Sequence, residues 1–123
     1  MSQLSYLRVY SGDDGKSHME TQTVHLGKTN YAPPAPVLNS SALEPASASL
    51  FLELPAGWWG DWHPTPVRQW IAILSGTCEF EVEDGTVSIQ KKGDLIMLDD
   101  RHGKGHRSRV IGEIPLRMVA IHI

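Results

Sequence analysis

The sequence has little that would support a disulfide framework, a membrane span or a nucleic-acid interface. Its one cysteine, Cys78, cannot close an internal disulfide, and the alternation of residues 77–82 places it on the apolar face of a strand. No apolar run approaches the about 20 residues that cross a bilayer, and no signal peptide opens the chain. A formal net charge of -3 gives no basic field for a phosphate backbone. We therefore expect a cytoplasmic protein with no nucleic-acid and no membrane partner, and a thiol that belongs to the core.

Helical periodicity is also missing from the 123 residues, a length that suits one domain. From Ala48 onward the chain alternates in short runs separated by turn signals, of which Asp84-Gly85 is the clearest hairpin. The expected strands are 50–54, 68–74, 78–83, 86–90, 95–98, 107–111 and 117–123. Short strands spaced about every ten residues predict a sandwich or a jelly-roll barrel.

The N-terminal part has a different composition. Residues 6–10 and 20–26 are predicted as strands, whereas residues 32–49 contain four prolines among alanine and serine. We interpret 32–49 as a long loop lying over the barrel. The predicted organisation is a single domain, 1–123, with N-terminal strands and a Pro-rich loop in 1–47 and a core barrel in 48–123.

The segment 57–76, GWWGDWHPTPVRQWIAILSG, resembles the first motif of the cupins. In that motif a Gly is followed six residues later by His-x-His, then by a Glu and a closing Gly. The spacing agrees at Gly57, His63, Gln69 and Gly76, but Thr65 stands where the second His is expected and Gln69 stands where the Glu is expected.

The segment 93–106, GDLIMLDDRHGKGH, resembles the second cupin motif, in which Gly-Asp opens a strand and a third His follows a turn. Asp99 replaces the family's Pro, and the His falls two residues later than usual. His106 is therefore the candidate for the inward-facing His, with His102 as the alternative if the register differs. The resemblance implies an all-β cupin double-stranded β-helix, that is, a jelly-roll antiparallel barrel with an N-terminal arm, and a homodimer.

The resemblance also implies a site. Cupins usually hold a transition metal with three imidazoles and a carboxylate, and the matching positions here would offer His63, Gln69 and His106 to a divalent Mn, Fe, Ni or Zn ion. Because an amide oxygen is a poorer ligand than a carboxylate, the affinity should fall. A pocket for a small-molecule ligand, anionic or aromatic, is expected from bulky rings and a nearby guanidinium. Its predicted lining is Trp58, Trp62, Thr65, Arg68 and Trp70.

Three functions remain open at this point, and no catalytic residue is identified. One is a metal-dependent isomerase, lyase or dioxygenase with a degenerate ligand set. Another is a metal-free, epimerase-like cupin with a His as general base, which would need a His paired with a buried Asp, from Asp61 or Asp94 facing inward. The last is a non-catalytic ligand-binding or sensing module. Whether the protein is an enzyme is not decided by the sequence, because one fold hosts many chemistries.

Overall fold

The computed structural model describes residues 2–123, and all regular secondary structure within them is β. The strands are β1 (Ser2–Ser11), β2 (Ser17–Thr29), β3 (Leu38–Ser40), β4 (Ala48–Leu54), β5 (Trp59–His63), β6 (Gln69–Ser75), β7 (Thr77–Val82), β8 (Val87–Lys91), β9 (Leu95–Asp99), β10 (His106–Ile111) and β11 (Leu116–His122). No helix long and apolar enough to span a bilayer occurs in residues 2–123.

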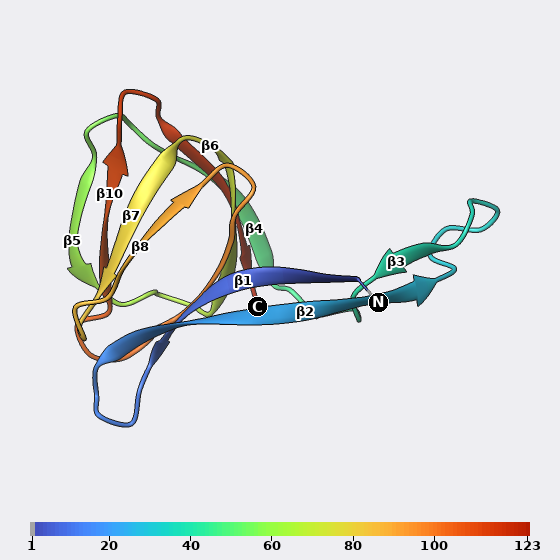
Figure 1. Cartoon of the computed structure of the whole chain (residues 1–123), viewed down its shortest axis with the longest axis horizontal. Helices are drawn as coiled ribbons and strands as arrows, with labels where there is room; N and C mark the ends of the chain where they lie inside the picture. Colours follow the sequence, from blue (N-terminus) through green and yellow to red (C-terminus); the bar gives the residue numbers. More distant parts are fainter. Residues whose placement is uncertain (1) are drawn as a thin grey trace.

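The strands form two sheets that face each other as a barrel (Figure 1). One sheet has seven strands in the order β3-β2-β1-β9-β6-β11-β4, and the other has four in the order β5-β10-β7-β8. Neighbouring strands are antiparallel except β1 and β9, which run parallel. The predicted jelly-roll fold is confirmed, with β1 added to one edge of the larger barrel wall by this parallel pair.

The core fills the space between the two sheets with alternate side chains, because residues two apart on a strand share a face. On β6 these are Ile71 and Ile73, and on β7 they are Cys78, Phe80 and Val82. Burial raises the pKa of the Cys78 thiol to about 12, with a smaller contribution from the negative charge of Asp94. The thiol is therefore inert at neutral pH, as expected of a core residue.

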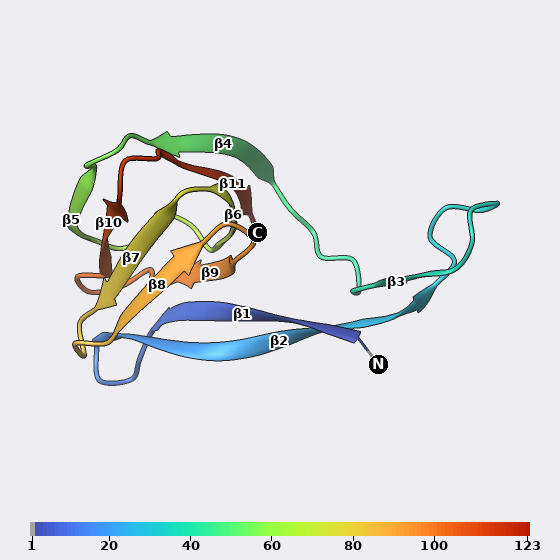
Figure 2. The ribbon, with the colours of Figure 1, turned by 45° about the horizontal axis from the view of Figure 1, so that its top comes forward.

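The N-terminal hairpin continues well beyond the barrel as an arm (Figures 1 and 2). Strands β1 and β2 pair from Ser2 opposite Leu26 to Ser11 opposite Ser17, so both are longer than predicted. The prediction that residues 32–49 form a loop lying over the barrel is wrong in two respects. Residues 30–37 form the distal end of the arm, and the chain then returns through β3, which pairs with the end of β2. Prolines ended β2, but they did not prevent a short edge strand after them.

Candidate functional site

The barrel encloses a cavity of about 210 Å³ between its two sheets. Most of its wall is apolar, with Trp58, Ile71, Phe80, Leu98 and Met118 among the lining residues. The polar or ionisable side chains in the wall are His63, Thr65, Gln69, Cys78, His106 and Ser108. A mostly apolar pocket with a few convergent polar groups is the usual form of a small-molecule site.

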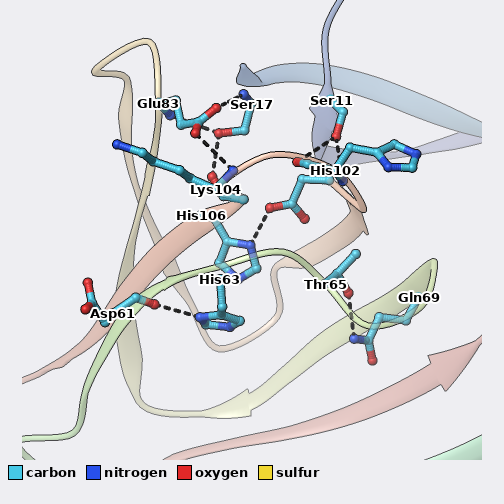
Figure 3. Close-up of polar contacts among 12 residues, drawn as sticks. Ser11, Ser17, Asp61, His63, Thr65, Gln69, Glu83, His102, Lys104 and His106 are labelled. Carbon is cyan, nitrogen blue, oxygen red and sulfur yellow. Dashed lines mark hydrogen bonds and ion pairs between the residues drawn. The ribbon is translucent and has the colours of Figure 1, made fainter. Parts of the chain in front are cut away.

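His106 begins β10 and is 3 % exposed. Its Nδ1 lies 2.6 Å from Oδ2 of Asp100, which is fully buried, in the geometry of a strong charge-assisted hydrogen bond (Figure 3). With the carboxylate as the acceptor, Nδ1 carries the proton and Nε2 is the free nitrogen. The register of the second motif thereby follows the longer turn, because His102 is exposed and His106 faces the cavity.

His63 ends β5 directly opposite His106 in the pairing of β5 with β10. The two ring centroids are 4.7 Å apart, whereas His63 is exposed and His106 is buried. The Nδ1 atom of His63 donates to the carbonyl oxygen of Asp61 at 2.7 Å, which leaves its Nε2 free as well (Figure 3). The site therefore holds two adjacent imidazoles, each with Nδ1 bound to an oxygen acceptor.

Gly105 makes this close approach of β5 and β10 feasible. Its φ of +76° lies in the left-handed region, and a Cβ at this position would collide with the backbone of His63 and Pro64. Only glycine satisfies both conditions at once.

Thr65 and Gln69, which replace the second His and the Glu of the first motif, are bonded to each other. Nε2 of Gln69 donates to Oγ1 of Thr65 at 3.0 Å, and Oγ1 of Thr65 donates to the carbonyl oxygen of Val67 at 2.7 Å. Both side chains are buried. The two substituted positions are thus joined by one hydrogen bond within the wall.

The predicted pocket residues are separated by the structure. Trp58 and Thr65 line the barrel cavity. The guanidinium carbon of Arg107 lies over the ring of Trp62, 4.9 Å from the centroid of that ring. Arg68 and Trp70 line a different groove, between the arm and the barrel, because Trp70 alternates with the inward-facing Gln69 and Ile71.

Asp100 is the functional candidate that the sequence reasoning missed. Asp61 and Asp94, the two aspartates considered for pairing with a His, bond instead to the backbone N–H groups of Trp62 and Lys91. The neighbouring Asp99 has a different role, because it contacts Arg8, Arg68 and Arg101. Alternation along the strand could have indicated that Asp100 is buried. Ile96, Leu98 and Asp100 are two residues apart, and all three are buried.

The site fits a transition metal only in part. Two imidazoles with Nδ1 bound to an oxygen acceptor are the usual arrangement of metal-ligating histidines. The third donor is the neutral amide of Gln69, and the Asp100 carboxylate is bonded to His106 Nδ1, away from the free Nε2. Within residues 2–123, no three His, Cys, Asp or Glu side chains are grouped to share an ion. This donor set suits weak binding rather than a tightly held resident metal.

These features define a class: a two-sheet β-barrel with a ligand-sized interior cavity and a buried His-Asp pair in its wall. A sequence profile described as "Cupin domain" matches residues 50–122, which is more than half of the chain. The chain belongs to the cupin family.

One solved structure supports this fold. The cupin domain of Schizosaccharomyces pombe Cnp3 superposes with a TM-score of 0.53 at 16 % identity, covering 98 % of this chain and 82 % of that one. A putative ethanolamine utilization protein, EutQ, from Salmonella typhimurium gives a TM-score of 0.43 at 15 % identity, covering 99 % of this chain and 97 % of that one. No curated protein matches the sequence. The first similarity supports the fold, and none of them assigns an activity.

Proposed function

We propose that the barrel binds a small neutral molecule and that His106 acts on it as a general base oriented by Asp100. The observation that carries this proposal is the 2.6 Å contact between His106 Nδ1 and Asp100 Oδ2, buried in the wall of an otherwise apolar cavity. A His paired with a buried Asp is the feature that separates a metal-free, epimerase-like cupin from the other two hypotheses.

The pair supplies what a general base needs. Asp100 holds the proton of the neutral ring on Nδ1, so the lone pair of Nε2 is available to the cavity. When Nε2 takes a proton, the imidazolium that forms is stabilised by the adjacent carboxylate. Oδ1 of Asp100 is buried with no hydrogen-bond partner in residues 2–123, so the carboxylate's charge is directed mainly at His106.

Size and charge narrow the ligand class. An engineered apolar cavity of about 150 Å³ binds benzene, so the volume of about 210 Å³ suits one ring or a short branched chain. No Lys or Arg is among the lining residues, and the buried Asp100 carboxylate disfavours a second negative charge. The ligand we propose is therefore neutral and largely apolar, in place of the anionic one considered from the sequence.

The reaction that fits is proton transfer at a carbon next to a carbonyl group. His106 Nε2 removes the proton, the C–H electron pair becomes a C=C bond, and the carbonyl oxygen takes the negative charge. We propose that His63, whose ring centroid lies 4.7 Å from that of His106, is the donor to that oxygen. Return of the proton to the opposite face of the same carbon restores the carbonyl group and gives an epimer, without any co-reactant.

Hydrogen exchange of cyclohexanone in D₂O, followed by NMR, tests the proposal without knowledge of the natural ligand. We expect the protein to accelerate loss of the α-proton signals, and His106→Asn and Asp100→Asn to lower this rate by about 100-fold or more. His102→Asn is the matched control, because His102 lies exposed in the same turn. Equal rates for the wild type, His106→Asn and buffer alone would contradict the proposal.

Binding of a divalent transition metal by His63, Gln69 and His106 is a second candidate function. The observation that favours it is that both histidines donate Nδ1–H to oxygen and leave Nε2 free. Elemental analysis after growth with added Mn, Fe, Ni and Zn tests it, with His63→Ala and His106→Ala as comparisons. More metal in the wild type than in both variants would support this candidate; equal metal in the wild type and the two variants would contradict it.

A further inference from the structure

The turn that carries His106 is bound by the N-terminal hairpin. Ser17, at the start of β2, is fully buried, and its Oγ donates to the carbonyl oxygen of Gly105 at 2.6 Å (Figure 3). The same Oγ accepts the backbone N–H of Glu83 at 2.9 Å. One hydroxyl therefore connects the residue before His106 to the β7–β8 turn.

The Glu83 carboxylate closes the second half of this connection. Its Oε2 accepts the backbone N–H of Ser17 at 2.9 Å, and its Oε1 accepts the backbone N–H of Lys104 at 3.1 Å (Figure 3). Hydrogen bonds to an ionised acceptor are stronger than neutral ones. Glu83 thus binds the backbone N–H of Lys104, and Ser17 binds the backbone carbonyl of Gly105.

The hairpin also contacts the earlier part of the turn. The backbone N–H of His102 donates to Oγ of Ser11 at 3.2 Å. Gly103 lies so close to Gly15 that a Cβ on Gly103 would stand 2.8 Å from the Gly15 carbonyl oxygen. Both ends of the β1–β2 turn therefore pack on the segment between Asp100 and His106.

The conformation of the turn between Asp100 and His106 sets the distance between their side chains. The two residues flank the longer turn of the second motif, which contains two glycines with positive φ, and such a turn has many alternative conformations when free. A shift of less than 1 Å would lengthen the 2.6 Å contact between Nδ1 and Oδ2 beyond a strong hydrogen bond. A turn of this kind needs support from outside itself.

We infer that Ser17 and Glu83 are positioning residues that hold His106 in contact with Asp100. This inference deepens the proposed function and rests on it for its catalytic meaning. Ser17 belongs to the hairpin, which precedes the segment 50–122 that matches the cupin profile. The N-terminal hairpin is then part of the site, although none of its residues lines the barrel cavity.

The test uses ¹⁵N-histidine NMR on the full chain with Ser17→Ala and Glu83→Gln. In the wild type we expect a downfield His106 Nδ1–H signal protected from solvent exchange. Loss or weakening of the supporting hydrogen bonds should speed its exchange by about 10-fold in each variant and lower the cyclohexanone rate by a similar factor. Ser5→Ala is the control, because Ser5 is exposed on the same hairpin, away from the turn.

The outcomes separate the two proposals. Wild-type protection of the Nδ1 proton in both Ser17→Ala and Glu83→Gln would overturn the positioning role, even if their unfolding midpoints fall. Faster Nδ1 exchange in both variants, with no cyclohexanone exchange in the wild type, would support the positioning role and refute the general base. If Ser17→Ala does not fold, Glu83→Gln decides the question, because it leaves the Ser17 hydroxyl in place.

Discussion

The barrel and the arm are both built from paired strands, but the barrel buries its apolar side chains and the arm leaves them exposed. In the barrel, two sheets face each other, and Leu116 is 1 % exposed. In the arm, no second sheet of residues 2–123 covers the outer hairpin, and Tyr31 is 66 % exposed, with Leu43 at 92 % in the segment that returns from the arm to the barrel. Strand pairing alone therefore forms the arm, whereas pairing together with burial forms the barrel.

This difference has a functional meaning. The barrel end of the hairpin bonds to the turn beside His106 through Ser17, while the outer end extends past the barrel (Figures 2 and 3). Positioning of the site requires the first part only. Changes near the barrel should therefore have large effects on stability and on the His106 site, and changes in the outer arm should have small ones.

A pair of glycines should give the largest contrast. Gly105→Ala places a Cβ against the backbone of His63 in a left-handed conformation, so we expect a loss of about 4 kcal/mol or more, or failure to fold. Gly27→Ala in the arm meets no atom within 4 Å and should be neutral or stabilising by less than about 1 kcal/mol. Urea unfolding measures both, and similar losses at the two positions would break the comparison.

A pair of leucines tests burial by itself. Leu116→Ala should cost about 2–5 kcal/mol, because it leaves a cavity in the barrel core. Leu43→Ala should change the free energy of unfolding of a single chain by no more than about 0.5 kcal/mol. A loss for Leu43→Ala that grows with protein concentration would show instead that another copy of the chain covers the arm.

The homodimer implied by the cupin resemblance stays a prediction, and it concerns the same exposed arm. Light scattering should give twice the 13.6 kDa of the chain, with an unfolding midpoint that rises with concentration. A single-chain mass at every concentration would contradict it and would leave the apolar residues of the arm solvated.

The smallest effect should come from His18, where the hairpin meets the barrel. Hydrogen bonding of its ring to Asp14, and secondarily to Asp84, raises the pKa of His18 above the ordinary 6.5. The folded state then binds this proton more tightly, so the contribution to stability is complete below about pH 6.5 and is lost as pH rises through the higher value. Urea unfolding at pH 6 and pH 8 should show a smaller pH dependence for His18→Gln than for the wild type; an unchanged dependence would exclude His18 as its source.

Much of the barrel was predictable because alternation is local. The strands from Ala48 onward, the Asp84-Gly85 hairpin and the buried Cys78 each follow from polarity over a few residues. Strand β5 was missed because its sequence, WGDWH, does not alternate clearly and is held by pairing with β10. Residues 32–49 were misjudged because the short strand β3 is held by pairing with β2 and buries little, so composition suggested a loop.

At the site, motif spacing predicted His63, Gln69 and His106 as ligands; that role stays a prediction, and the structure shows that all three line the barrel cavity. The spacing of residues within the motifs gave no information on which side chains would contact one another. Asp100 was not among the candidates, and Trp70 and Arg68 line a groove other than the barrel cavity, because the sequence does not show which carboxylate reaches a ring or which face encloses a cavity.

The sequence by itself determined an all-β cupin barrel, an inert buried thiol and the two histidine positions, since each depends on a pattern within one strand or one motif. Only the tertiary structure decided that Asp100 pairs with His106, that Thr65 pairs with Gln69, and that Ser17 and Glu83 hold the turn between them. The contacts of Ser17 join residues 66 and 88 positions apart in the chain, and the Asp100–His106 contact depends on the conformation of a turn that Ser17 and Glu83 support. Such contacts form only when separate strands are brought together by the packing of the barrel.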